Sequence, residues 1–393
     1  MSTIYVSGLG AVTPIGLDVA QFWSALINCQ SNFSAQASVY PGMKPGFMAA
    51  RINHAQKILL KQRAPDITGP QVPDSSLYAV DAAIQAINDA GLTPGCDALR
   101  KALVCVGNNE AEADILDRLL EDDHEGWRNN TYSSHAIARN VAQAIGSQGP
   151  ALCFHNTCAS ANVGLEFALR MLRSGAIDTA VVGGGDAFSK KVWSGFYTLN
   201  ALGEQQCKPF SRDRRFITIS EGAAFMVLQR AADIVSASPY AELLAVASNN
   251  DAAHPTNPDL AGVSTCHQRV LRQAGLQADD ISAIYAHGTG TKANDLTEST
   301  IFASTYPSAA VTAIKGTVGH MMATAGAIGG VASCLSLRHQ LLPPTQIDPD
   351  SLEYGIDLVT TPGGLSRELR YVQNNSFGFG GNNAISIFKA IEQ

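Results

Sequence analysis

The stretch FHNTCASANVGLEFALRMLRSG, residues 154–175, joins an apolar segment to an amphipathic helix and places Cys158 at the junction. Four apolar residues follow at helical spacing, namely Leu165, Ala168, Leu169 and Leu172. A thiol at the start of a helix feels the positive end of the helix dipole, which lowers its pKa and favours a nucleophilic thiolate. A buried free cysteine is the alternative, since cysteine is among the most buried residue types. This segment alone leaves the choice open.

Short β-rich runs alternate with helical patterns along the whole chain. Strands are predicted at residues 4–12, 102–108, 151–156, 179–186, 241–248, 281–288 and 309–316, helices at 74–92, 162–175, 267–276 and 321–337, and a closing hairpin at 369–388. This alternation predicts an α/β fold built of layers. A chain of 393 residues exceeds the usual size of a single core, so we predict two halves, residues 1–238 and 239–393.

The composition is that of a well-buried globular protein, with 46% hydrophobic and 16% charged residues. The formal net charge of −7 gives no general reason to expect nucleic acid binding. None of the eight cysteines forms a CxxC pair, which argues against a disulfide scaffold and a zinc site and fits a reducing compartment. The uncharged run 321–337 is too short for a membrane span. We therefore expect a cytoplasmic protein that binds no membrane.

Two histidines follow predicted strands, His287 in IYAHGTGTKAND and His320 in AIKGTVGHMMATAGA. Loops at the carboxyl ends of strands are where sites gather in α/β sheets. One histidine in a glycine-rich loop is more often structural. Two of them, each near Gly and Thr, together with Cys158 at a strand-to-helix junction, favour an active site. A metal site is not expected, because the three residues include no local ligand pair.

The turn NNSFGFGGNNA, residues 374–384, is rich in glycine and carries Phe377 and Phe379. A phosphate-binding loop is a poor interpretation, since no Lys-Ser/Thr pair and no helix follow. The glycines indicate backbone that approaches a ligand closely, beside an aromatic side chain that is free to swing.

In this order and spacing, the motifs resemble the β-ketoacyl-acyl-carrier-protein synthases of the thiolase superfamily, most closely the elongating type II enzymes. The likeness covers nearly the whole chain, through VSGLGAVTPIG, NTCASANVG, VVGGGDA, KPFSRDR, EGAA, HGTGTKANDLTE, KGTVGHMMATAGA and NSFGFGGNNA. Thiolases carry a second catalytic Cys, and initiating synthases carry Asn for the second His, so both match less well. The resemblance implies a thiolase-like fold of two similar αβαβα halves that form five layers, with the site where the halves meet.

The resemblance also implies a reaction. Cys158 would be acylated by an acyl-carrier thioester, and His287 and His320 would bind the malonyl thioester and stabilise the enolate formed as carbon dioxide leaves. The product would be a 3-oxoacyl thioester, in fatty acid or polyketide and polyene biosynthesis. A soft thiol exchanges one thioester for another at little cost, and neutral imidazoles donate to an oxyanion. No cofactor is implied, because phosphopantetheine arrives on the carrier protein.

Further roles follow from the same resemblance. Lys315 would tune His320, the backbone amides of Cys158 and Phe377 would form an oxyanion hole, and Phe377 would act as a gate. The residues expected to touch the pantetheine arm or to border the gate are Thr289, Thr291, Phe379, Asp251 and His254.

The chain departs from the family pattern in three places. Gly329 stands nine residues after His320, where the family often has a Glu paired with the lysine. Arg215 and Phe216 replace a common Asp-Gly. Near the expected acyl pocket, small or apolar residues are replaced by Asn108, Asn109 and Glu110. We expect a short, aromatic or polyunsaturated acyl group and a specialised pathway.

An acidic carrier protein would dock on a local basic patch, for which the candidates are Lys57, Lys61, Arg63 and Lys208. The resemblance implies a homodimer or a heterodimer with a related synthase subunit. Three alternatives remain: a chain-length-factor-like partner subunit, a Cys–His hydrolase, and a binding protein. Chain-length factors lack the nucleophilic cysteine that this chain retains at Cys158.

Overall fold

The computed structural model describes residues 2–40, 42–63, 72–120, 133–234 and 238–391. Its centre is a ten-stranded mixed sheet in the order β11-β10-β14-β15-β9-β1-β8-β6-β4-β5. The first half of the chain supplies β1 (Ile4–Val12), β4 (Leu103–Gly107), β5 (Ala151–Phe154), β6 (Thr179–Asp186) and β8 (Gly222–Arg230). The second half supplies β9 (Ala241–Asn250), β10 (Ala283–Tyr285), β11 (Ala310–Thr312), β14 (Tyr371–Gly378) and β15 (Asn382–Lys389).

The two halves repeat one strand arrangement. In the first, β1 pairs antiparallel with β8 and β8 with β6, and then β6–β4 and β4–β5 are parallel. In the second, β9–β15 and β15–β14 are antiparallel, and β14–β10 and β10–β11 are parallel. The groups meet where β1 pairs with β9 through Tyr5–Glu242 and Val6–Ala241. The chain therefore contains a structural duplication that its letters do not reveal.

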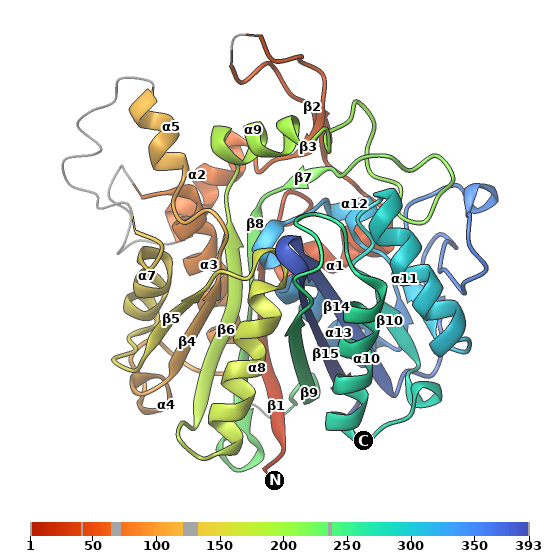
Figure 1. The fold of residues 1–393 in the computed structure, drawn as a ribbon. Helices are drawn as coiled ribbons and strands as arrows, with labels where there is room; N and C mark the ends of the chain where they lie inside the picture. Colours follow the sequence, from red (N-terminus) through yellow and green to blue (C-terminus); the bar gives the residue numbers. More distant parts are fainter. Residues whose placement is uncertain (1, 41, 64–71, 121–132, 235–237, 392–393) are drawn as a thin grey trace.

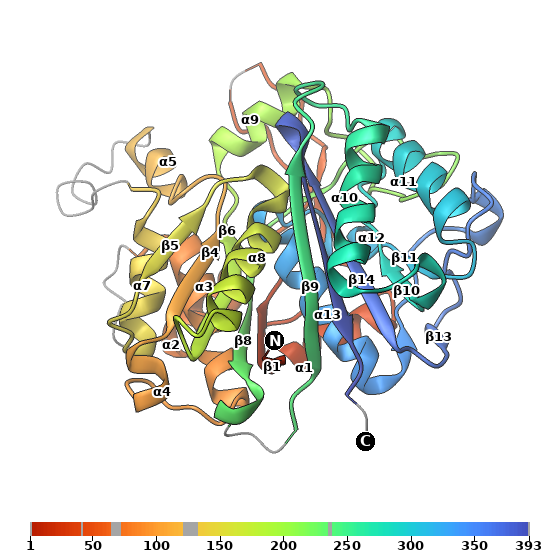
Figure 2. The same cartoon turned by 60° about the horizontal axis from the view of Figure 1, so that its bottom comes forward.

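Helices complete the layers (Figure 1). The outer helices α3 (Asp74–Asp89) and α7 (Ala136–Ile145) pack on one side, and α10 (Leu260–Ala274) and α11 (Lys292–Thr305) cover the other. Between the strand groups lie α8 (Ser160–Arg173) and α13 (Ala325–His339), which contact strands of both halves. Figure 2 shows β9 between α8 on its left and α10 on its right. The predicted α/β layering is confirmed.

Glycine allows the closest contact between an outer helix and the sheet. A Cβ at Gly8 in β1 would lie 2.1 Å from the carbonyl oxygen of Ala86, and one at Gly10 would lie 1.9 Å from that of Ala82. Helix α3 therefore rests directly on the β1 backbone. Helix α13 is buried from Ala325 to Leu337 and rich in small residues, which confirms the buried helix predicted there.

The remaining elements border this core. The helices are α1 (Val19–Ile27), α2 (His54–Arg63), α4 (Asp97–Arg100), α5 (Asp114–Leu120), α9 (Lys190–Thr198) and α12 (Lys315–Val318), and the strands are β2 (Phe33–Ala35), β3 (Met48–Ala50), β7 (Ile219–Ser220), β12 (Leu341–Leu342) and β13 (Leu365–Ser366). In the ranges given above, no helix is both long and apolar enough to cross a membrane.

Some boundaries differ from the predicted ones. Helix α10 begins at Leu260, seven residues earlier than predicted, because the Asp259 side chain caps it by accepting from the Gly262 amide. Strands β10 and β11 are three residues each and end before the glycine-rich loops. The turns that precede α8 and α13 are alike: Thr157 has φ +51° and Met322 has φ +52°, and each opens a short 3₁₀ turn that leads into the helix.

Candidate active site

The turn from β5 into α8 presents Cys158. Its preceding residue, Thr157, adopts a left-handed conformation that is rare for a β-branched residue. A Cβ at Gly378 would lie 1.9 Å from the Thr157 hydroxyl and 2.9 Å from the Cys158 nitrogen. Only glycine therefore lets the β14–β15 hairpin, from the second half, approach the thiol this closely.

The structure brings Cys158, His287 and His320 together, although they are far apart in sequence. The Cys158 sulfur lies 3.2 Å from His320 Nε2, and the two imidazole rings lie 5.5 Å apart at an interplanar angle of 86°. All three side chains are buried. His287 follows β10 by two residues, as predicted. His320 does not directly follow a strand, because the single-turn helix α12 intervenes.

Hydrogen bonds fix the tautomers of both histidines. His320 Nδ1 accepts from the Met322 amide at 3.0 Å, and His287 Nδ1 lies 3.2 Å from the Lys315 amine. Each ring therefore carries its proton on Nε2. Burial, reinforced by the charge of Lys315, holds the pKa of both imidazoles well below its usual value. The site thus contains two neutral N–H donors.

Burial also sets the ionisation of the nucleophile. It raises the pKa of Cys158 to about 12, and the positive charge of Lys315 opposes this rise in part. The predicted lowering of this pKa by the helix start is therefore wrong, since the thiol is enclosed rather than exposed to solvent. The Cys158 sulfur receives the Nε2–H of His320 at 3.2 Å.

Lys315 contacts a different histidine from the one predicted. Its amine donates to the backbone carbonyl of His287 and lies against the Nδ1 atom of the same residue. It acts on His320 through its charge, not through contact. Lys315 therefore positions His287 directly.

Glu298 in α11 holds the His287 loop and was not singled out from the sequence. Its carboxylate accepts from the amides of His287 at 2.8 Å and Gly288 at 2.6 Å. It also accepts from the side chains of Asn294 at 2.8 Å and Asn375 at 3.3 Å. The sequence could have indicated Glu298, because this residue ends the motif HGTGTKANDLTE that contains His287.

Asn374 fills the space beside Gly329, where the family often has Glu. A Cβ on Gly329 would lie 2.1 Å from Asn374 Oδ1. The Asn374 amide is buried and donates to the Gly326 carbonyl at 2.9 Å and to the Ser386 hydroxyl at 3.2 Å. In this chain the space beside Gly329 is therefore filled by a side chain of β14.

We expect Gly329→Ala to destabilise the protein by about 1–3 kcal/mol despite the helix propensity of alanine, because Asn374 cannot move without breaking its hydrogen bonds. In an Asn374→Ala background the same change should cost less, with a coupling of about 1 kcal/mol. Urea unfolding of the two single variants and the double variant measures both the loss of stability and the coupling energy. Gly330→Ala is the control for a new methyl group in the same helix, since this methyl group would meet Met226 at 2.9 Å and the Phe388 ring at 3.2 Å but not Asn374. Additive costs at Gly329 and Asn374 would contradict the interpretation.

A cavity of about 250 Å³ leads to the three central residues. Its wall includes the other predicted contacts Thr289, Thr291, Phe377 and Phe379. The hydroxyls of Thr289 and Thr291 lie 2.9 Å apart, and Phe377 packs 5.9 Å from the His287 ring. These side chains place polar groups along the cavity and an aromatic ring beside the thiol.

Asp251 and His254 do not line this cavity. Asp251 accepts from the Asn383 side chain at 2.9 Å, and His254 Nδ1 accepts from the amides of Thr256 and Asn257 at 3.1 and 3.0 Å. Thr256 and Asn257 do line the cavity. His254 therefore holds the loop that brings Thr256 and Asn257 to the wall, whereas Asp251 contacts β15.

The three polar residues near the expected acyl pocket also lie outside this cavity. Asn108 is fully buried and donates to the Gly185 carbonyl at 2.7 Å, and the Asn109 amide donates to Asp186 at 3.0 Å. Glu110 pairs with Lys191 at 2.8 Å. Asn109 and Glu110 line a separate hollow with Ser133, Ser134 and His155.

The donor atoms of Cys158, His287 and His320 lie within 4.8 Å of one another, so their spacing alone would suit a metal ion. The surroundings of these atoms do not suit a metal ion. Lys315 places positive charge against His287, which would repel a metal ion bound there. The arrangement fits covalent thiol chemistry assisted by N–H donors.

Comparison with known proteins agrees with this geometry. Residues 1–233 match the β-ketoacyl synthase N-terminal domain, and residues 240–347 match the C-terminal domain. Nodulation protein E of Rhizobium meliloti (strain 1021) is 29% identical over 99% of both chains, and 3-oxoacyl-[acyl-carrier-protein] synthase 2 of Vibrio cholerae is 27% identical over 98% of both.

Solved structures give the same result for the whole chain. The structure described as the ishigamide ketosynthase/chain length factor covers 100% of both chains with a TM-score of 0.89 and 29% identity. The AntDE:AntF complex, a type II ketosynthase with its acyl-carrier protein, also covers 100% of both, with a TM-score of 0.84 and 26% identity. The predicted thiolase-like fold is therefore confirmed. The chain belongs to the β-ketoacyl synthase family and is a β-ketoacyl-acyl-carrier-protein synthase, an acyltransferase.

Proposed function

We propose that this synthase condenses malonyl-carrier protein with an acyl group held on Cys158 and releases a 3-oxoacyl-carrier thioester. The observation that carries the proposal is the cavity that brings Cys158, His287 and His320 together at its inner end. No separate cofactor takes part, because phosphopantetheine enters on the carrier protein.

In the first step the sulfur of Cys158 attacks an acyl-carrier thioester. The S–acyl bond to the pantetheine sulfur breaks, an S–acyl bond to Cys158 forms, and the thiol proton leaves with the departing pantetheine thiol. The His320 Nε2–H, 3.2 Å from the sulfur, stabilises negative charge as it develops there. The amides of Cys158 and Phe377 hold the tetrahedral oxyanion in this proposal.

In the second step malonyl-carrier occupies the same cavity. The bond to its carboxylate breaks, carbon dioxide leaves, and the electron pair forms an enolate whose oxygen accepts from His287 and His320. The enolate carbon then attacks the acyl carbonyl, and the Cys158 sulfur departs and takes up one proton. Neutral imidazoles suit this step, because they donate to the oxyanion without burying a fixed charge.

The acyl group proposed is short, aromatic or polyunsaturated, in a polyketide or polyene pathway more than in fatty acid synthesis. The support is the sequence departure at Asn108, Asn109 and Glu110, two of which line the hollow beside β5 and not the Cys158 cavity. The similarity to the ishigamide and AntDE ketosynthases is of the same order as the similarity to fatty acid synthases, so identity does not decide the matter.

A second protein subunit is proposed to pack on the β5 edge of the sheet. All four residues of β5 are half-buried, and the neighbouring apolar side chains include Phe167 and Met171 on α8. An apolar edge strand favours pairing with another chain. The partner is a second copy or a related synthase subunit, and the carrier protein docks on the basic residues of α2 and on Lys208.

Intact mass spectrometry after incubation with a panel of acyl-carrier proteins tests the function. We expect the wild type to gain one acyl mass that malonyl-carrier then removes as a 3-oxoacyl thioester, and Cys158→Ala to gain none. The panel also identifies the acyl class. Cys105→Ala, at a buried cysteine in β4 away from the cavity, is the control and should still be acylated.

Three outcomes would contradict the proposal or a part of it. Release of free acid without malonyl-carrier would indicate a hydrolase. Acylation of no chain length would favour a non-catalytic partner subunit, and a C16 acyl group as the best substrate would overturn the proposed acyl class.

A further inference from the structure

Arg215 is the only residue with a fixed charge among those that line the Cys158 cavity in the described parts of the chain. It is exposed, and within those parts it forms no hydrogen bond or ion pair through its guanidinium. The other lining groups are apolar or neutral, including Leu199, Asn200, Thr289 and Thr291. A free cation therefore borders an otherwise uncharged path to the thiol.

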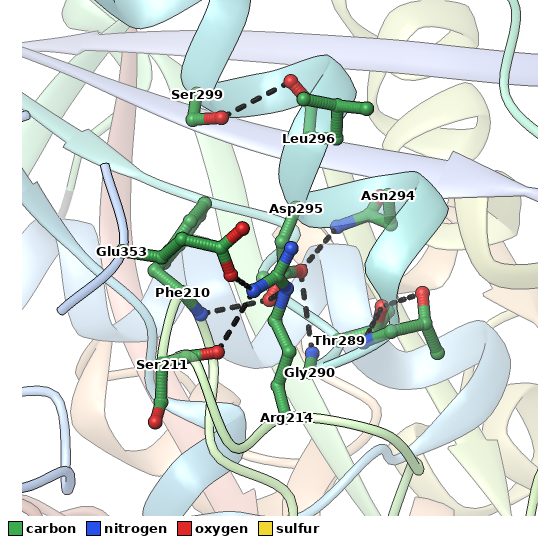
Figure 3. A network of polar contacts seen from close by, with 12 residues as sticks. Phe210, Ser211, Arg214, Thr289, Gly290, Asn294, Asp295, Leu296, Ser299 and Glu353 are labelled. Atoms are coloured by element: carbon green, nitrogen blue, oxygen red, sulfur yellow. Dashed lines mark hydrogen bonds and ion pairs between the residues drawn. The ribbon is translucent and has the colours of Figure 1, made fainter. Parts of the chain in front are cut away.

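The neighbouring residues hold Arg215 in this direction. Arg214 points inward and is buried, where it pairs with Asp295 at 3.7 Å and with Glu353 (Figure 3). On the other side Phe216 packs so closely on Gly203 that a Cβ there would lie 2.3 Å from the ring. With both neighbours anchored inside, the Arg215 side chain is directed outward to the cavity.

The Asp295 carboxylate links the loop that carries Arg215 to the opposite wall of the Cys158 cavity. Asp295 accepts from the amide of Phe210 at 2.7 Å, on the Arg215 loop, and from the amide of Gly290 at 3.3 Å, between the two threonines (Figure 3). A Cβ on Gly290 would lie 3.1 Å from the Lys208 nitrogen, so the loops touch. The backbone of the Arg215 loop is therefore linked to the segment that carries Thr289 and Thr291.

We propose that Arg215 binds the phosphate of the phosphopantetheine arm where the arm leaves the cavity. This inference rests on the synthase function proposed above. The arm carries its reacting sulfur at one end and a phosphodiester at the other, with uncharged amides between. The cavity offers the matching order: the thiol inside, threonine hydroxyls along the wall, and an arginine that is exposed. A guanidinium suits phosphate because two of its N–H groups meet two oxygens at once.

The test compares acetyl-phosphopantetheine with acetyl-pantetheine, which lacks the phosphate, because acetyl is the smallest acyl group and needs no particular acyl pocket. The rate of Cys158 acetylation is followed by intact mass. Arg215→Ala should lower kcat/KM for the phosphorylated donor by about ten-fold or more and leave the unphosphorylated donor unchanged. Arg215→Lys should retain part of the preference, since it keeps the charge.

Arg212→Ala is the matched control. Arg212 lies on the same loop and is exposed, but its side chain donates to the Asp350 carbonyl and it does not line the cavity. It should leave the preference for phosphate intact.

Each other outcome overturns a different claim. Equal acetylation by both donors in the wild type, or an equal loss with both in Arg215→Ala, overturns phosphate binding alone. A loss seen only with intact acetyl-carrier protein shows that Arg215 meets carboxylates of the carrier instead. No acetylation of Cys158 by either donor overturns the synthase function, and this inference with it.

Discussion

His287→Ala and His320→Ala are expected to lower condensation by about 10²–10³-fold each, because each removes one N–H donor from the enolate. The two variants should differ in the first half-reaction. His320 contacts the Cys158 sulfur at 3.2 Å, whereas His287 is held by Lys315 and Glu298. His320→Ala should therefore slow acylation of Cys158 as well, and His287→Ala should leave it nearly unchanged. Acyl transfer by intact mass and release of carbon dioxide from malonyl-carrier separate the two steps.

Glutamine variants are the controls for these losses. A glutamine side chain places its amide N–H near the position of Nε2, so His287→Gln and His320→Gln should recover part of the decarboxylation rate. If His287→Ala blocked acylation as fully as His320→Ala, the assignment of separate roles would be wrong.

Glu298→Ala is expected to have the second largest effect. It leaves four buried donors without their acceptor, two of them the backbone amides of His287 and Gly288, and should cost at least about 3 kcal/mol of the free energy of unfolding. The protein that still folds should lose about 10²-fold in condensation, because the His287 loop shifts. Urea unfolding and carbon dioxide release, measured on the same samples, test both expectations.

A second buried carboxylate separates stability from positioning. Asp81 in α3 accepts from Gln85 at 2.6 Å and is remote from His287. Asp81 also lies 3.9 Å from Arg63, a proposed carrier-docking residue, so decarboxylation is measured here with malonyl-pantetheine. Asp81→Ala should lower stability and leave this rate in the folded fraction unchanged. Acylation of Cys158 should survive in Glu298→Ala. If both variants lost decarboxylation equally, Glu298 would be a structural residue only.

Much of the site was predictable because few residue types can serve as a nucleophile or as a neutral N–H donor. A cysteine between a strand and a helix, and two histidines in glycine-rich loops, form a pattern that the motifs made specific. The β-rich runs and the hairpin at 369–388 were also predictable, since their alternation is local.

Other features depend on contacts that spacing does not encode. The raised pKa of Cys158 follows from how completely the two halves enclose it, and the partner of Lys315 follows from the path of its side chain. Asn374 could not be connected with Gly329 from the sequence, because they lie on separate elements that meet only in the folded protein. The outward direction of Arg215 likewise depends on the burial of Arg214 and on the packing of Phe216 against Gly203.

The similar turns before α8 and α13 have different roles in the two halves of the chain. Cys158 in the first turn corresponds to Ala323 in the second, each one residue after the left-handed position. The first copy keeps a reactive atom there, while the second uses its backbone, since the Ala323 amide donates to Asp186 of the first copy at 2.8 Å. The same turn geometry thus presents the nucleophile in the first half and, through backbone amides of the second, holds His320 and braces Asp186.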